Sequence, residues 1–180
     1  DPADVSAVHA LQDAVAVQQD NAGSFDVPTW DPVSQKTVRD ALVTLATTLP
    51  DTRGTFGTKG DTDPIRHLIG TANAWGGNPE KDALYLAVVP PRNDGTTVHR
   101  LIVGEVPADG FWSVTVYNSD GYFTANERNA YSYNNVTAQK GPDGTTTIQF
   151  GGCDGATPNC LPITPGWNYT VRLYRPRQEI

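Results

Sequence analysis

From residue 83 onward, short apolar runs alternate with turn motifs, and this pattern limits the possible folds more than any other feature of the sequence. Sequences such as PPRNDG and GPDG separate the runs. Runs of roughly four to eight apolar or alternating residues, bounded by Gly, Pro, Asn and Asp, are typical of strands. The sequence therefore predicts strands at five places: 83–89, 96–103, 111–117, 145–150 and 168–175.

The composition of these runs indicates how the strands are buried. Trp112, Val114 and Val116 recur at every second position and predict one apolar face. The run 83–89 is apolar throughout, so we expect it to be buried on both faces. With 17 Gly and 14 Pro residues to form turns, the sequence predicts a mainly β fold, an antiparallel jelly-roll-like sandwich. Three tryptophans are expected to anchor its core: Trp75, Trp112 and Trp167.

The chain before residue 75 carries a helical pattern instead. Asp-Pro pairs stand at 1–2, 31–32 and 63–64, where each Asp is a candidate N-cap and each Pro a candidate first helical residue. Apolar residues at helical spacing follow each pair. The predicted helices lie near three ranges: 3–19, 32–48 and 64–74. We therefore expect a helical N-terminal segment with two helices, 1–60, and a β domain, 61–180.

The charge balance excludes some classes of partner. The chain has 13 Lys and Arg against 20 Asp and Glu, a formal net charge of -7. A surface of that sign repels phosphate backbones, so the sequence predicts no nucleic-acid binding. No apolar run reaches the roughly 18–20 residues that span a bilayer, so no membrane span is expected. The absence of Met and the start at Asp1 indicate a processed product, for which a removed signal peptide is one explanation.

Two cysteines bear on the compartment. Cys153 and Cys160 enclose the turn-forming residues DGATPN, which bring the two ends together and favour a local disulfide over two reduced thiols. A zinc site would need a second pair of ligands, so no metal is predicted. A disulfide implies an oxidising compartment, and we expect an extracytoplasmic protein, periplasmic or secreted.

Three long stretches resemble a known family. They begin DPIRHLIGTANAWGG at residue 63, DGFWSVTVYNSDGYF at 109 and FGGCDGATPNCLPIT at 150. Together they are similar to the DUF1214 domain over roughly residues 60–180. The resemblance implies a jelly-roll-like β domain, usually in an exported bacterial protein, where it commonly follows a DUF1254 domain. It implies no secure activity. Only about 60 residues precede the domain, so the chain is either a fragment of such a protein or a short, one-domain form.

The most polar segment of the β region follows the predicted strand 111–117. Tyr offers an apolar ring with one hydroxyl, Asn offers donors and acceptors, and Arg offers a forked donor for carboxylates. This mixture suits a small polar or carbohydrate ligand. The alternative is a structured loop whose side chains satisfy its own backbone. The candidate ligand-binding residues are Asn118, Asp120, Tyr122, Asn126, Arg128 and Tyr131.

Two residues are candidate catalytic bases. His67 lies four residues after Asp63, which could orient its ring, and Glu127 lies in the polar loop. With Arg128 positioning an anion, either base would suit a hydrolase or lyase acting on a glycan or an ester. The alternative for His67 is a half-buried histidine that joins helix to sheet. No G-x-S-x-G elbow and no phosphate-binding loop is present, so no cofactor is predicted.

Three functions follow from these observations. The first is a non-catalytic module for ligand or glycan binding or for assembly, which uses the loop 118–131. The second is the hydrolase or lyase with His67 or Glu127 as base. The third is a purely structural domain that forms homo-oligomers through sheet packing. The sequence leaves open whether the protein is an enzyme.

Overall fold

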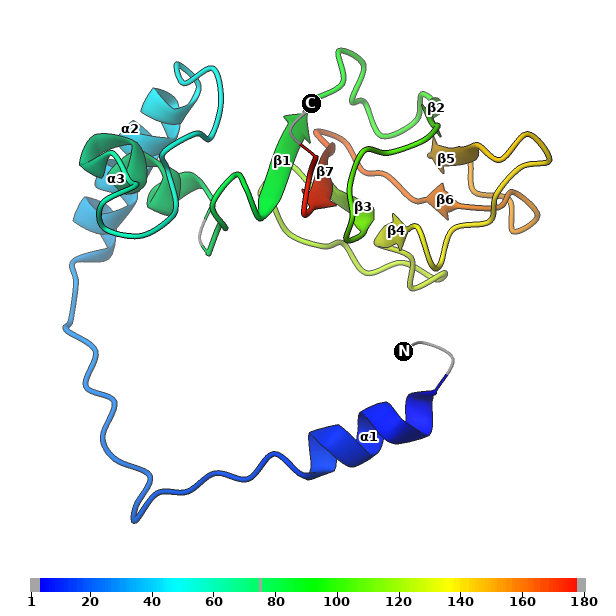
Figure 1. Cartoon of the computed structure of the whole chain (residues 1–180). Coiled ribbons are helices and arrows are strands. Elements are labelled where there is room, and N and C mark those ends of the chain that lie inside the picture. The colour runs from blue at the N-terminus through cyan, green and yellow to red at the C-terminus, as the bar shows by residue number, and fades with distance from the viewer. Residues whose placement is uncertain (1–3, 75, 178–180) are drawn as a thin grey trace. The chain divides into compact units, whose positions relative to one another are not determined.

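The computed structural model describes residues 4–74 and 76–177, so Asp1, Pro2 and Trp75 lie outside the described residues. By its internal contacts the chain divides into two units, residues 1–36 and 37–180. Within the described residues, three helices come first and seven strands follow (Figure 1). The predicted domain boundary at residue 60 stays a prediction.

Helix α1 (Val5–Asp13) is shorter than the range predicted from the sequence. Asp4 is its N-cap, and its side chain accepts a hydrogen bond from the backbone N–H of Ala7. None of its residues is buried. Apolar residues at helical spacing continue to Val15, but the helix ends at Asp13. Most helical stability in proteins comes from packing of an apolar face, and α1 has no buried residue to extend it.

The caps of the next two helices were predicted correctly. Helix α2 (Pro32–Ala46) begins after Asp31, whose side chain accepts from the N–H of Ser34 at 2.8 Å. Helix α3 (Pro64–Asn73) begins after Asp63, whose carboxylate accepts from the N–H groups of Ile65 and Arg66. In both helices Pro is the first helical residue, where its missing N–H costs nothing.

The strands form two sheets. In the first sheet β1 (Ala83–Val88), β7 (Asn168–Tyr174), β3 (Trp112–Tyr117) and β4 (Ser132–Asn134) lie in that order, all antiparallel. The second sheet has the order β2 (His99–Val103), β5 (Thr146–Phe150) and β6 (Cys160–Leu161). β2 and β5 are antiparallel, whereas β5 and β6 are parallel. All five predicted strands are present; β4 and β6, three and two residues long, were missed.

Both sheets contribute to one core. Trp112, Val114 and Val116 of β3 belong to it, as their alternation predicted, and Trp167 is fully buried. The remaining buried members come from β5, β6 and β7: Ile148, Phe150, Leu161 and Leu173. From residue 83 the chain is thus mainly sheet, in two sheets that are mostly antiparallel. The jelly-roll connectivity stays a prediction.

The prediction that the first strand is buried on both faces was wrong. Among the described residues β1 pairs with β7 alone, so it is an edge strand of its sheet. Ala83 is buried, but Leu86 is 52% exposed. A continuous apolar run is common to central strands and to edge strands that meet another surface, and periodicity alone does not separate the two.

Candidate functional site

The polar loop that follows β3 opens with a turn built around Asn118. Its side-chain Oδ1 accepts hydrogen bonds from the N–H groups of Asp120 and Tyr122, at 3.0 and 2.9 Å. Its carbonyl oxygen accepts from the side chain of Asn168 on β7. Asn is favoured in such turns because its short amide reaches its own following backbone. The side-chain oxygen of Asn118, which the sequence predicted as a ligand-binding group, therefore already accepts two backbone hydrogen bonds.

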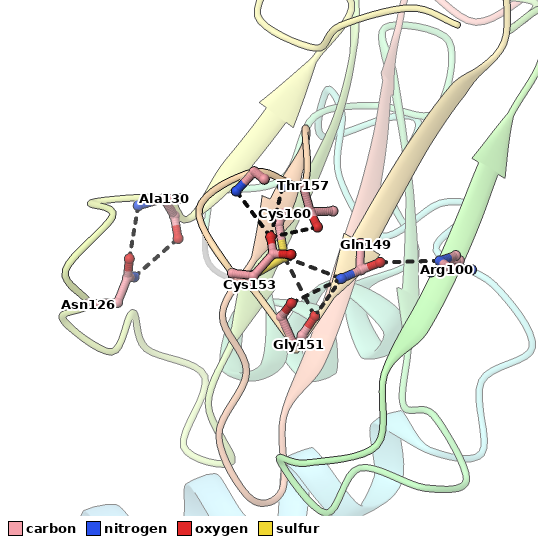
Figure 2. The surroundings of a disulfide bond; sticks show 11 residues. Arg100, Asn126, Ala130, Gln149, Gly151, Cys153, Thr157 and Cys160 are labelled. Carbon is pink, nitrogen blue, oxygen red and sulfur yellow. Dashed lines mark hydrogen bonds between the residues drawn. A yellow bond between two sulfur atoms is a disulfide. The ribbon is translucent and has the colours of Figure 1, made fainter.

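Asn126 has the same role further along the loop. Its Nδ2 donates to the carbonyl oxygens of Thr124 and Ala130, and its Oδ1 accepts from the N–H of Ala130. Figure 2 shows this reciprocal pairing of Asn126 with Ala130. For Asn118 and Asn126 the arrangement matches the structured-loop alternative, since an irregular segment must satisfy its backbone groups locally.

The other candidate residues remain available at the surface. Asp120, Glu127 and Arg128 are exposed, and Tyr122 is 72% exposed. The guanidinium of Arg128 lies close to Gly155, in the loop closed by the two cysteines. The loop thus places an exposed cation beside the disulfide, and none of its carboxylates pairs with that cation among the described residues.

Three aromatic rings form a row at the base of this loop. The ring of Phe123 stacks on Tyr117, with centroids 5.4 Å apart, and on Tyr131, with centroids 5.0 Å apart. Phe123 is nevertheless 54% exposed. Arg172 of β7 donates from Nη2 to the hydroxyl of Tyr117 at 2.7 Å, and its Cζ lies 5.8 Å from that ring. We call Tyr117, Phe123 and Tyr131 the aromatic row.

Phe123 and Arg172 were missed by the sequence analysis. Phe123 lies in the predicted polar loop but is not among its candidate residues, and Arg172 lies within the predicted strand 168–175. A signal did exist for Arg172, because an arginine on the outward face of a central strand is rarely solvated on all sides. On β3 the residue paired with Arg172 is Ser113, whereas Tyr117 is paired with Asn168. The strand register alone therefore does not predict the contact between Arg172 and Tyr117.

A small space lies beneath the loop. The cavity lined by Tyr117, Asn118, Asn126 and Tyr131 with residues of the segment 162–164 has a volume of about 10 Å³. That is close to the space that one water molecule occupies. A ligand at this loop would therefore lie on its surface.

His67 is anchored differently from the prediction. His67 is exposed, and its Nδ1 lies 2.8 Å from the carbonyl oxygen of Thr55. Because a carbonyl only accepts, Nδ1 carries the proton and Nε2 is left free. The ring meets Phe56 edge-on, whereas the carboxylate of Asp63 is used by the helix cap. His67 thus joins α3 to the preceding loop, and no hydrogen bond or ring contact in the described part of the chain links it to Glu127.

The two cysteines form the predicted disulfide, Cys153–Cys160. Gln149 of β5 supports it: its Nε2 donates to the carbonyl oxygen of Gly151 at 3.0 Å and lies 3.8 Å from the Sγ of Cys160. Arg100 donates to the other end of the same amide. Figure 2 shows Gln149 bridging Arg100 and the disulfide loop. This buried amide is satisfied at both ends, so the disulfide loop is fixed to the sheet.

A much larger hollow lies at the other end of β3. It is a groove of about 480 Å³, where β2 ends and β3 and β5 begin. Apolar lining comes from Val106, Ala108, Phe111 and Trp112. Volumes of this size are usual for small-molecule sites. The groove could not be predicted from the sequence, because its walls come from separate segments, 104–112, Asn135 and 140–146, and none of these carries a motif.

Polar groups in the groove are less fully paired than those of the loop. The Oδ1 of Asn135 is buried and finds no hydrogen-bond partner among the described residues. Glu105 and Lys140 line the groove with exposed side chains. Asp143 accepts at Oδ1 from the N–H and the hydroxyl of Thr145, and these two bonds hold its pKa below the usual value of 3.8.

Among residues 4–74 and 76–177, no group of three or more His, Cys, Asp or Glu side chains is placed to hold a metal ion. No helix there is both long and apolar enough to cross a membrane.

Residues 91–178 match the DUF1214 family, described as a protein of unknown function, and the resemblance seen in the sequence is confirmed. The comparison with curated proteins finds no match. Among solved structures, the chain is similar to the VPA0106 protein from Vibrio parahaemolyticus, with a TM-score of 0.62 and 24% identity over 86% of this chain and 44% of that one. An uncharacterised protein from Burkholderia cenocepacia matches with a TM-score of 0.43 and 15% identity, over 84% of this chain and 41% of that one. The chain therefore spans less than half the length of either.

Proposed function

We propose that this chain, with its DUF1214 region at residues 91–178, is a non-catalytic binding module of an exported bacterial protein. Its ligand is a small anionic molecule with hydroxyl groups, such as a uronic-acid unit of a glycan. The binding surface comprises the aromatic row and the exposed side chains of the 118–131 loop. The observation that carries the proposal is the aromatic row, stacked at the end of β3 with a guanidinium at one end.

The chemistry of this surface supports an anionic saccharide. Exposed aromatic rings offer apolar area to the C–H face of a sugar, and Phe123 is more than half exposed. Arg172 has no carboxylate partner among the described residues, and Arg128, in the same loop as Phe123, is exposed. A guanidinium that is not already paired is well suited to a carboxylate, which it binds with two parallel hydrogen bonds.

The compartment is supported by the disulfide. A bond between Cys153 and Cys160 persists in an oxidising environment and is rare in the cytosol. Periplasmic or secreted location is therefore part of the proposal.

The catalytic alternative has less support. A general base works best in a site that excludes water. His67 and Glu127 are both exposed, and the space beneath the loop holds about one water. The hydrolase or lyase reading would need a second surface to close over one of these bases.

Assembly is a second candidate function, and the helical segment favours it. Within residues 37–180, three apolar side chains of α2 and α3 are more than half exposed: Val38, Ile65 and Leu68. Monomeric proteins rarely leave such faces uncovered. Sedimentation velocity at several concentrations tests self-association, and Val38→Asp should abolish any dimer that forms through α2.

Titration calorimetry with three matched compounds tests the binding proposal. Galacturonate and galactose differ in one carboxylate, and acetate supplies that carboxylate without the sugar. We expect galacturonate to bind and the other two to bind at least about tenfold more weakly, since a charge-assisted pair contributes more than a neutral hydrogen bond. Arg128→Gln and Phe123→Ala should each weaken the binding of galacturonate.

Arg92→Gln is the matched control, because Arg92 is exposed and lies outside the loop. Binding that is equally weakened by the control would show a general charge effect and contradict a site at the loop. Equal affinity for galactose and galacturonate would contradict the anionic ligand class. The absence of heat with all three compounds, from a folded protein, would remove the binding proposal and leave assembly.

A further inference from the structure

We propose that the groove between β2, β3 and β5 is a second binding site, and that it takes a small zwitterion: a molecule with an ammonium group, a carboxylate group and an apolar side chain, as in a free amino acid. This inference is independent of the proposed function, since the groove and the 118–131 loop lie at opposite ends of β3.

The position of the groove is the first step. Gly104 follows the last residue of β2, while Trp112 and Thr146 are the first residues of β3 and β5, and all three line the hollow. It therefore opens at one end of the core, between the two sheets. Ligand sites are common at the mouths of β structures, where side chains of the core form the floor and loops supply polar groups.

The groove offers acceptors for an ammonium group. Asn135 brings a buried Oδ1 that has no partner among the described residues, and its backbone N–H donates to the carbonyl oxygen of Trp112 at 3.4 Å. A buried acceptor without a partner destabilises a fold by about 1–3 kcal/mol, so rotation of the Asn135 side chain toward the groove, where a ligand ammonium group can donate to Oδ1, would be favourable. Glu105 adds a carboxylate to the same lining.

The groove also offers a cation for a carboxylate. Lys140 is exposed on the groove wall, and no ion pair holds it among the described residues. Asp143 lies on the same hairpin, but its Oδ1 is used by Thr145, so it sets the turn that presents Lys140. A backbone hydrogen bond from Gly141 to Thr145 at 2.7 Å closes that hairpin. Lys140 is thus the groove's only cation in the described lining.

The apolar lining accounts for the side chain of the ligand. Val106, Ala108 and Phe111 lie in the groove, and Phe111 is 45% exposed although its ring stacks on Tyr174 at 4.2 Å. An apolar group of the ligand would cover part of this exposed surface. The three features, an acceptor pair, a cation and an apolar wall, match the three parts of an apolar amino acid.

The test uses leucine and its two truncated analogues. 3-Methylbutylamine lacks the carboxylate and 4-methylpentanoate lacks the ammonium group, while the apolar part is unchanged. Amide chemical-shift mapping locates any binding, and titration to about 50 mM ligand gives its affinity. We expect leucine to shift amides of 104–112 and 140–146, and to bind about tenfold or more tightly than either analogue, because each analogue loses one charged partner.

Four variants assign the roles. Glu105→Gln should weaken leucine binding and leave the affinity for 4-methylpentanoate unchanged. Lys140→Gln should weaken leucine binding and leave the affinity for 3-methylbutylamine unchanged. Asp82→Asn and Lys81→Gln remove the same charges at exposed positions at the start of β1 and should change nothing. Melting curves establish that each variant is folded.

Several outcomes would overturn the inference. Binding of 3-methylbutylamine as tight as that of leucine would assign the groove to amines alone. Shifts confined to the loop 118–131 would place the ligand elsewhere. No shift at about 50 mM leucine, from folded protein, would leave the groove without this ligand class.

Discussion

The two ends of β3 differ in how their polar groups are used. After Tyr117, the loop 118–131 is rich in polar residues, yet Asn118 and Asn126 direct their amides at the backbone of the loop itself. At the start of β3, polar and apolar residues line the groove in similar number, and the buried Oδ1 of Asn135 has no partner among the described residues. The contrast shows that polar composition is a poor guide to a binding site. What identifies one is the set of polar groups left over when the backbone has been satisfied.

The largest expected effect on stability is that of removing the disulfide, which lies beside the loop at the C-terminal end of β3. Replacing both Cys153 and Cys160 by Ser removes a cross-link between residues seven apart. The unfolded chain then gains entropy, and the free energy of unfolding should fall by about 2.5 kcal/mol. Denaturant unfolding of the parent and the double variant measures the change.

The groove should be unaffected by this loss. Leucine binding by the folded double variant is expected to equal that of the parent, while galacturonate binding is expected to weaken because Arg128 rests beside Gly155 of the disulfide loop. If both ligands weaken equally, the two ends of β3 are coupled, and the comparison between them fails.

Two asparagines sharpen the comparison directly. Asn118→Ala removes an acceptor from two backbone N–H groups, so the free energy of unfolding should fall by about 1 kcal/mol. Asn135→Ala removes a buried acceptor that has no partner, so stability should be unchanged or should rise by up to about 1 kcal/mol. Denaturant midpoints of the two variants, compared at unchanged m-values, test this difference in sign.

The binding assays complete that pair. Asn135→Ala should weaken leucine binding in the groove, since stability gained at a functional site is commonly exchanged for function. A variant that is destabilised as much as Asn118→Ala would mean that Asn135 is paired in solution. In that case the groove and the loop would use their polar groups alike.

The stability of the two ends of β3 should depend on acid pH in the same way. Hydrogen bonds from the N–H and then the hydroxyl of Thr157 hold the pKa of Asp154 below 3.8, and Thr145 does the same for the pKa of Asp143. A carboxyl whose pKa is lower in the folded state stabilises the fold above about pH 4, and this contribution is lost as the pH falls through and below that value. Melting temperatures should therefore decrease between about pH 5 and pH 2.

Asparagine at these positions separates the charge from the turn. Asp143→Asn and Asp154→Asn keep an Oδ1 acceptor but do not titrate, so each should flatten the acid part of the stability profile slightly. Both groups are fully exposed, and the effects are expected to be small. A profile steepened by either change would contradict the assigned cause of the lowered pKa.

The smallest effect is expected at Tyr122. Its side chain is 72% exposed, so Tyr122→Ala should change the free energy of unfolding by less than about 0.5 kcal/mol. Its neighbour Phe123, which stacks on two rings, should cost more when replaced by Ala. Equal losses at the two positions would mean that the aromatic row contributes nothing to stability.

Much of the fold followed from local patterns in the sequence. The caps at Asp31 and Asp63, the alternating face of β3 and the disulfide between Cys153 and Cys160 were all predicted. Each depends on residues close together in the chain, whose spacing is fixed by helix, strand or turn geometry. The six ligand-binding candidates in the loop stay predictions. The side-chain amides of Asn118 and Asn126 already bond to the backbone of the loop, so fewer polar groups remain for a ligand than the sequence indicated.

Only the tertiary structure decided what lies side by side. The edge position of β1 follows from its single neighbour, β7, and the contact of Arg172 with Tyr117 joins strands more than fifty residues apart in sequence. The groove is made from three segments that share no motif. Sequence patterns report which backbone conformation a segment favours, whereas a cavity depends on the surfaces that packing leaves unfilled. The sequence by itself therefore determined five of the strands, the caps of α2 and α3 and the disulfide of this protein, whereas packing determined its two shortest strands and its groove.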